Sequence, residues 1–290
     1  MKRVLVIGEN SYIGRSFEVF VKDKYEITMV SSRNNVWQGI NFAKYDSVLH
    51  CAGIAHISHN PKMESLYYEV NCDLAVNVAN KAKSEGIRQF IFLSSILVYG
   101  TNQSEVNHTT LPKPDNFYGN SKLKAEQELD KLASKNFNLC IVRSPMVYGR
   151  GCKGNFPKLV RLAKITPIFP AYPSKRSMIY IDNLCEFLCG MVDDEATGVF
   201  LPQNKEYLNA AEFVKFIADY DRRYIVTTRL FNPLIRLLMK RIAVFQKLFG
   251  GLYYTKQGNE DDYNIVEFDK SIYQSIENRT LSADLVLEYE

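Results

Sequence analysis

The sequence contains no C-x-x-C pair, although it has six cysteines in 290 residues. Without closely spaced thiols we expect a reduced, cytoplasmic protein rather than a disulfide framework. The opening apolar run is too short for a secretory signal peptide, which agrees with that expectation. His56 and His59 lie among polar loop signals, and no carboxylate or cysteine spacing around them predicts a metal site.

Blocks of like charge and long apolar runs are also missing. The 36 basic and 32 acidic residues are spread along the chain, so the net charge of +4 predicts no nucleic-acid partner. No apolar run approaches the roughly 20 residues that a membrane-spanning helix needs. With 46% hydrophobic residues, the chain can bury a large core and form one large domain or two unequal lobes.

The first residues read as a strand, a glycine turn and a helix. Residues 3–7 form a short apolar run that breaks at Gly8, and a helical pattern resumes near Ile13. Gly8 and Gly14 match the first and last glycines of a dinucleotide fingerprint, but Ser11 replaces the middle one. Backbone N–H groups around Tyr12 would face a phosphate in such a turn. A plain strand-to-helix turn explains the same residues almost equally well.

The second predicted strand, residues 26–30, ends without an acidic residue. An acid at this point would bind the ribose hydroxyls of NAD, whereas arginine can accommodate the 2′-phosphate of NADP. Ser31, Ser32 and Arg33 follow the strand, so we expect NADP(H) to be favoured, with NAD(H) as the alternative. A solvated loop with one arginine explains these residues as well.

Two further stretches contain candidate catalytic residues. Residues 89–95 read as a buried strand ending in two serines, and residues 118–135 read as a helix. Tyr118 and Lys122 are four residues apart and should share one face of that helix. A neighbouring ammonium favours the phenolate, so we expect Lys122 to lower the pKa of Tyr118. An ordinary surface helix is the alternative.

Several motifs in order carry a resemblance to a known family. They are the Gly8 turn, residues 94–100 (SSILVYG), the Tyr118/Lys122 pair and residues 143–149 (RSPMVYG). Together they resemble the extended short-chain dehydrogenase/reductase, or NAD-dependent epimerase/dehydratase, family over nearly the whole chain. Residues 50–56, 151–156 and 175–183 are similar to the branch with UDP-N-acetylquinovosamine-type 4-ketoreductases and UDP-hexose 4-epimerases.

The resemblance implies a Rossmann-type doubly wound parallel sheet with a smaller C-terminal lobe. It implies a catalytic set of Ser95, Tyr118 and Lys122, with Asn71 in a structural role. Asn155, Phe156 and Arg176 would contact the substrate, Arg176 through its diphosphate. The cofactor would be bound by Gly8, Ser11, Tyr12, Ile13, Gly14, Ser31, Ser32, Arg33, Cys51, Ala52, Gly53, Tyr118, Lys122 and Ser144.

The implied domain boundaries follow from where the pattern changes. We expect a dinucleotide-binding domain over residues 1–150, with the chain returning to it at about 177–202. Residues 151–176 and 203–290 would form the substrate lobe. Within that lobe, residues 230–249 are basic and apolar, a pattern that can lie on an anionic membrane. We expect instead a lobe helix whose apolar face is core. Residues 262–268 read as a closing strand and 269–276 as a helix.

The expected function is oxidoreduction at C4 of a nucleotide sugar, in the synthesis of surface polysaccharide precursors. The favoured reaction is reduction of a UDP-linked 4-keto-6-deoxyhexosamine by NAD(P)H, with Tyr118 as the proton donor. A UDP-hexose 4-epimerase with bound NAD is the first alternative. A non-catalytic protein that binds a sugar nucleotide or dinucleotide is the second. A homodimer could form through the helices near residues 62–85 and 117–135, as in relatives.

Overall fold

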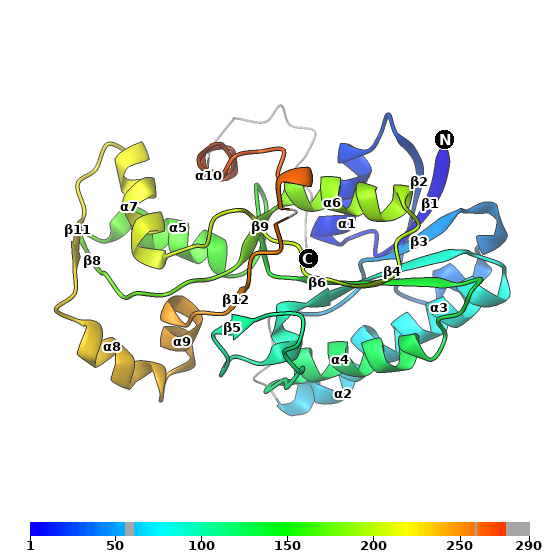
Figure 1. Cartoon of the computed structure of the whole chain (residues 1–290), viewed down its shortest axis with the longest axis horizontal. Helices are drawn as coiled ribbons and strands as arrows, with labels where there is room; N and C mark the ends of the chain where they lie inside the picture. The colour runs from blue at the N-terminus through cyan, green and yellow to red at the C-terminus, as the bar shows by residue number, and fades with distance from the viewer. Residues whose placement is uncertain (56–60, 259, 277–290) are drawn as a thin grey trace.

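The computed structural model describes residues 1–55, 61–258 and 260–276 (Figure 1). His56 and His59 lie outside the described residues. Six parallel strands form the main sheet in the order β10-β6-β4-β3-β1-β2. Their bounds are β1 (Lys2–Ile7), β2 (Tyr25–Val30), β3 (Ser47–His50), β4 (Gln89–Ser95), β6 (Asn138–Ser144) and β10 (Gly198–Phe200).

Helices cover both faces of this sheet (Figure 1). On one face α1 (Tyr12–Phe20) packs against α6 (Ile181–Asp193). On the other, α3 (Leu74–Ser84) packs against α4 (Phe117–Asp130). Because both faces are covered, β3 and β4 are buried along their whole lengths. The predicted α/β class with a doubly wound parallel sheet is confirmed.

The connection from β2 to β3 contains no further strand among its residues, all of which the structure describes. Two 3₁₀ turns, η1 (Val36–Gly39) and η2 (Phe42–Lys44), occupy it instead. Trp37 and Phe42 anchor these turns in the core, with exposures of 4% and 0%. The chain therefore returns to the sheet beside β1, and β2 remains the edge strand.

A second group of elements, most of which follow β6 in the chain, occupies the left and centre of Figure 1. Its helices are α5 (Asn155–Ile165), α7 (Ala210–Tyr220), α8 (Asn232–Met239), α9 (Ala243–Phe249) and α10 (Phe268–Ile276). Its short parallel pairs are β7 (Met146–Tyr148) with β9 (Met178–Tyr180), and β8 (Ile168–Pro170) with β11 (Val226–Thr228). A third pair joins β5 (Glu105–Val106) to β12 (Tyr253–Tyr254).

One hydrophobic core joins this group to the sheet. It includes Val6 and Leu49 of the sheet together with Phe156 and Phe213 of α5 and α7. The division into a dinucleotide domain and a substrate lobe at the boundaries given above stays a prediction. No helix of the described residues is long and apolar enough to cross a bilayer.

The strand expected over residues 262–268 is absent from the structure, and that prediction is wrong. A 3₁₀ turn, η6 (Glu260–Asp262), is followed by irregular chain that leads into α10. The Asn264 side chain donates to the carbonyls of Gln203 and Glu260, and the Val266 N–H donates to Asn183. The Val266 N–H is therefore paired with a side chain and not with a neighbouring strand.

Candidate active site

The carboxyl ends of the central strands bring the predicted site residues together. In register, Ser95 at the end of β4 pairs with Ser144 at the end of β6. His50 at the end of β3 lies between Ile7 of β1 and Phe92 of β4. Ligands of open α/β sheets bind beyond the carboxyl ends of the strands, where the strand order reverses. Here that point lies between β1 and β3.

The Gly8 turn fits closely against the loop after β3. Gly8 has a φ of +117°, and a Cβ on it would lie 2.8 Å from the amide nitrogen of Ala52. Its N–H donates to the Val30 carbonyl at 2.9 Å, which also ties the turn to the end of β2. A side chain at this position would therefore strain the backbone and collide with the neighbouring loop.

Ser11 replaces the middle glycine of the fingerprint and caps α1. Its backbone is extended, and its hydroxyl accepts from the Gly14 N–H at 3.4 Å. Serine is a preferred residue at this position because it satisfies one of the unpaired N–H groups of the first turn. Ser11 therefore stabilises the helix end, and the amide groups of Tyr12 and Ile13 begin the helix beside it. The Tyr12 phenol extends to Gly149.

Ser31, Ser32 and Arg33 continue from the end of β2, next to the Gly8 turn. Ser31 accepts from the Arg33 N–H at 3.2 Å, which folds the segment into a tight turn. Arg33 is exposed, and none of the described acidic residues forms an ion pair with it. Its guanidinium is therefore free to bind an anion at this edge of the predicted cofactor site.

The structure brings together Ser95, Tyr118 and Lys122. Ser95 is 8% exposed, its hydroxyl accepts from the Leu97 N–H at 3.2 Å, and it lies near enough to the Tyr118 phenol, in the first turn of α4, to influence the pKa of that phenol. Asn116 caps that helix by accepting from the Gly119 N–H at 3.0 Å. Tyr67 packs edge-on against the Tyr118 ring, with 6.3 Å between centroids. These contacts hold the phenol at the end of β4.

The expectation that Lys122 lowers the pKa of Tyr118 is not met. Burial raises the pKa of Tyr118, and the nearby Ser95 hydroxyl opposes part of that rise. Lys122 instead points into the sheet, where its ammonium donates to the Leu93 carbonyl at 2.8 Å and lies 4.5 Å from the Phe92 ring centroid. Tyr118 is therefore a neutral phenol near pH 7, the form that donates a proton.

Lys122 is a buried cation without a carboxylate partner among the described residues. It is 4% exposed, and burial lowers its pKa to about 8. A Cβ on Gly53 would lie 3.2 Å from its Nζ, so the loop after β3 passes directly over the ammonium. The Ser144 hydroxyl is also buried and has no described hydrogen-bond partner. Unmet donors beside a close backbone loop suit the hydroxyls and amide of a bound nicotinamide nucleotide.

Asn71 fixes the loop after β3 to α4. Its amide donates to the Ile54 carbonyl and to the Ser121 hydroxyl, both at 3.0 Å, and accepts from the Ile54 N–H at 2.8 Å. The residue is fully buried in a π-helical turn, η4 (Glu69–Asp73), between α2 (Glu64–Tyr68) and α3. Such turns often mark functional positions in a helix. Here the π-helical turn positions the Asn71 amide between the loop after β3 and α4.

A buried ion pair that the sequence reasoning missed lies behind the site. Arg143 donates to Glu126 at 2.6 Å, and Glu126 also accepts from Ser94. The Arg143 guanidinium donates to the Tyr99 hydroxyl at 2.6 Å as well. The pair links β6, α4 and the end of β4, so it fixes the strand end on which Ser95 stands. No spacing in the sequence signals this pair, because its two residues lie 17 apart on a helix and a strand.

The predicted substrate residues occupy the second group of elements. Arg176 donates to the Gly250 carbonyl at 2.6 Å, and burial lowers its pKa to about 10. None of the described carboxylates pairs with it. Asn155 opens α5 and is half-buried. Phe156 is 3% exposed and packs between Tyr148 and Phe213, so its side chain belongs to the core.

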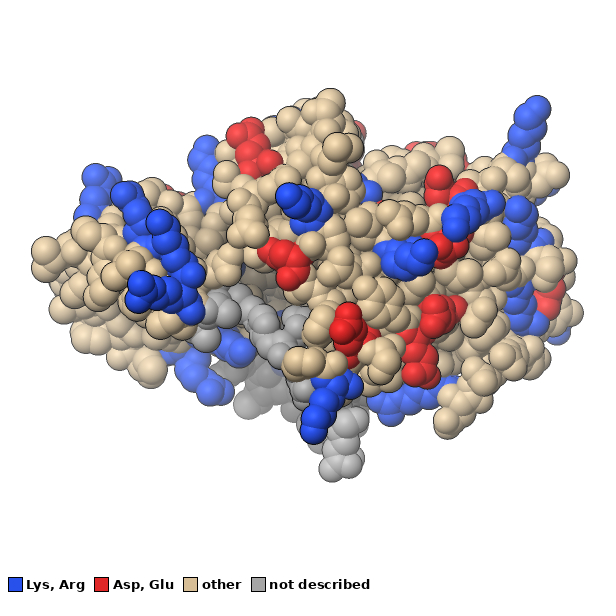
Figure 2. All heavy atoms as spheres, turned by 90° about the horizontal axis from the view of Figure 1, so that it is seen from below, with Lys and Arg blue, Asp and Glu red and all other residues tan. Residues whose placement is uncertain are grey.

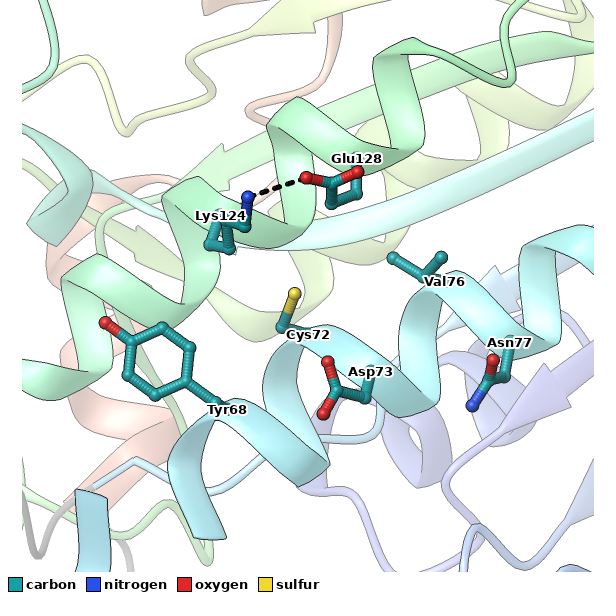
Figure 3. A pocket seen from close by; sticks show the side chains of 7 residues that line it. All are labelled: Tyr68, Cys72, Asp73, Val76, Asn77, Lys124 and Glu128. Atoms are coloured by element: carbon teal, nitrogen blue, oxygen red, sulfur yellow. Dashed lines mark hydrogen bonds and ion pairs between the residues drawn. The ribbon is translucent and has the colours of Figure 1, made fainter. Parts of the chain in front are cut away.

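The hollow in Figure 3 is separate from these residues. It lies between α4 and the α2–α3 segment and is lined by Tyr68, Cys72, Asp73, Val76, Asn77, Lys124 and Glu128. None of these residues belongs to the predicted site. The Lys124–Glu128 ion pair, at 2.6 Å, lies along its α4 side (Figure 3). These are the helices of the predicted homodimer, which stays a prediction.

Curated relatives carry C4-epimerase names. The chain is 36% identical over 186 residues to a UDP-glucose 4-epimerase of Vibrio cholerae, which covers 59% of this chain and 56% of that protein. It is 27% identical over 273 residues to N-acetyl-alpha-D-glucosaminyl-diphospho-ditrans,octacis-undecaprenol 4-epimerase of Escherichia coli O157:H7. That match covers 86% of this chain and 82% of the relative.

Solved structures share the fold. A human epimerase family protein with NADPH has a TM-score of 0.75 at 18% identity, covering 96% of this chain and 100% of that one. A UDP-glucuronic acid 4-epimerase variant of Bacillus cereus with NAD has a TM-score of 0.73 at 16% identity, covering 94% and 97%. At these identities the likeness shows the fold alone. The model of the NAD dependent epimerase/dehydratase family matches residues 4–199, and the chain therefore belongs to that family.

Proposed function

We propose that this enzyme transfers a hydride at C4 of a hexose carried on a diphosphate, and that its reaction is C4 epimerisation. The observation that carries the proposal is the meeting of Ser95, Tyr118 and Lys122 at the strand ends beside the Gly8 turn. The two relatives described above, whose names specify 4-epimerases, support the choice of C4 and of epimerisation.

The roles of the side chains follow from their positions. A bound nicotinamide supplies the acceptor and donor of the hydride. Tyr118 exchanges the proton of the C4 oxygen: it accepts that proton as C4 loses its hydride and returns it when the ketone is reduced. Ser95 hydrogen-bonds the same oxygen and steadies the charge that develops there. Lys122 holds its ammonium under the loop of Gly53, where cofactor hydroxyls would lie.

The neutral phenol of Tyr118 fits the reductive half of this reaction. Burial raises its pKa, so the side chain carries the proton that a ketone oxygen must receive. The oxidative half needs the phenolate, and a cation brought close to the phenol would favour that form. We therefore expect the proton affinity of Tyr118 to depend on whether the site is loaded.

The diphosphate would be held by the second group of elements. Arg176 is half-buried and has no described carboxylate partner, and Asn155 stands at the start of α5. Charge-assisted bonds to phosphate oxygens would offset the cost of burying this cation. UDP is the carrier named for one relative, and a polyprenyl diphosphate is the carrier named for the other.

A second candidate is reduction of a 4-keto sugar by NADPH. It is favoured by one observation, the segment of Ser31, Ser32 and Arg33 without an acid after β2. A reductase releases its oxidised cofactor after each turnover, whereas an epimerase can reuse the same molecule. A preference for NADPH would therefore favour the reductase.

The deciding experiment combines two readouts on the purified protein. Mass spectrometry of nucleotide released by denaturation, and NMR of UDP-glucose and UDP-N-acetylglucosamine incubated with the enzyme and NAD, identify cofactor and product. Bound NAD and formation of the C4 epimer support the first candidate. Consumption of NADPH with a 4-keto UDP-sugar supports the second. Absence of both reactions with these UDP-sugars and with a polyprenyl-diphosphate sugar would leave only the non-catalytic alternative.

A further inference from the structure

The segment from residue 222 to residue 259 carries eight basic residues and no acidic residue. The eight are Arg222, Arg223, Arg229, Arg236, Lys240, Arg241, Lys247 and Lys256. Elsewhere in the chain the two signs are mixed, and the net charge of the whole chain is only +4. Figure 2 shows Lys and Arg side chains gathered at the left end of the molecule, the end that carries α8 in Figure 1.

Exposed apolar side chains lie among these charges. Leu230 is 79% exposed, Leu234 53% and Leu237 52%, although the sequence predicts that the apolar side of this segment is core. Ile235, which is 2% exposed, makes the contact with the core instead. The expectation is therefore wrong for Leu234 and Leu237 of α8 and for Leu230, which precedes the helix.

The exposed residues of α8 form two neighbouring stripes. At 100° per residue, Leu234 and Leu237 lie on one flank of the outward surface, and Arg236 and Lys240 lie on the other. Both flanks face away from Ile235. Exposed leucines beside long basic side chains characterise helices that lie at a membrane interface, because the basic groups reach the phosphates while the leucines enter the acyl region.

We propose that this surface, defined by Leu230, Leu234, Arg236, Leu237, Lys240 and Arg241, docks the enzyme on an anionic membrane. A continuous positive field with no acid in the segment matches the negative headgroups of such a bilayer.

The docking surface leads directly into the predicted diphosphate site. After α8 the chain forms α9, which ends at Phe249, and the next residue, Gly250, accepts from Arg176 at 2.6 Å. Phe249 also packs on Phe169 and Tyr172, which makes this connection rigid. Docking would therefore hold Arg176 near the lipid headgroups. If the proposed function holds, a diphosphate-linked sugar anchored in the membrane becomes an accessible substrate.

The test is co-sedimentation of the whole protein with vesicles of phosphatidylcholine containing phosphatidylglycerol, and with phosphatidylcholine alone. We expect binding to the anionic vesicles that weakens as salt rises, because the Debye length falls from about 10 Å to about 3 Å between 0.1 M and 1 M salt. Activity plays no part in this readout, so failure of the proposed function would leave its result unchanged.

Two pairs of variants separate charge from insertion. Arg236→Gln with Lys240→Gln should lower the partition coefficient about 30-fold, since each basic residue near a surface contributes about fivefold. Leu234→Ser with Leu237→Ser should lower it by at least about tenfold. Matched controls are Lys22→Gln with Lys44→Gln, and Val19→Ser with Leu111→Ser, all at exposed positions elsewhere.

Three results would overturn the proposal. The first is that the wild type stays in the supernatant with the anionic vesicles. The second is that the control variants lose as much binding as the α8 variants. The third is that the leucine variants bind like the wild type, which would reduce the contact to attraction between any polyanion and a basic patch. Thermal melting of each variant verifies that it is folded.

Discussion

His50 is a buried histidine whose protonation should destabilise the fold. Its side chain is fully buried between the Phe90 and Phe92 rings, and neither ring nitrogen has a described hydrogen-bond partner. Burial, with a smaller effect from nearby Lys122, lowers the pKa of His50 to about 3. The unfolded chain, with an ordinary histidine pKa of about 6.5, therefore binds the proton first as the pH falls.

The sign and size of the effect follow from that difference. Above about pH 6.5 both states are neutral at His50, and the residue gives stability no pH dependence. Between about pH 6.5 and pH 3 only the unfolded chain is protonated, so each pH unit removes about 1.4 kcal/mol. At about pH 5 the loss from this single residue is about 2 kcal/mol.

His50→Leu should abolish that loss, because the variant cannot bind the proton in either state. Urea unfolding of the wild type and the variant at about pH 7.5 and about pH 5 gives the free energy of unfolding at each pH. The difference between the two proteins should grow by about 2 kcal/mol toward acid, in favour of the variant. His108→Gln, at an exposed position, should follow the wild type. Parallel losses in wild type and His50→Leu would refute the reasoning.

Three further predictions concern the site. Tyr118→Phe should lower turnover by about two orders of magnitude or more without unfolding the protein, and Ser95→Ala should lower turnover by a smaller factor. Near-normal turnover of Tyr118→Phe would show that Tyr118 is not the proton donor. Arg176→Ala should raise KM for the diphosphate-linked sugar about tenfold to hundredfold and leave cofactor affinity unchanged. Weakened cofactor binding with an unchanged KM would show that Arg176 does not bind the substrate diphosphate. Under the second candidate, reduction by NADPH, the wild type should bind NADPH about tenfold to hundredfold more tightly than NADH, and Arg33→Ala should remove most of that preference. Titrating both cofactors into both proteins measures it, and equal affinities in the wild type would discard the reductase.

The parallel sheet was predictable because its strands are continuous apolar runs that end in glycine or serine. Gly8 and Ser95 are therefore found at strand ends, as the sequence indicates. These features depend on neighbours in the chain, which a single sequence displays directly.

Features that depend on distant contacts were not predictable. The direction of the Lys122 side chain is set by the Leu93 carbonyl and the Phe92 ring, so spacing alone wrongly placed its charge on the phenol. The Glu126–Arg143 pair joins a helix to a strand 17 residues later. The exposure of Leu234 and Leu237 depends on which side of α8 meets the core.

Hydride transfer at C4 with Tyr118 as the proton carrier is tested most directly by isotope labelling. A UDP-hexose carrying deuterium at C4 is incubated with the wild type and with Tyr118→Phe, and NMR and mass spectrometry read the configuration and the label at C4. The account predicts that the wild type forms the C4 epimer with deuterium still on C4, and that the variant forms almost none. An epimer that has lost its deuterium to solvent, or equal conversion by both proteins, would contradict it.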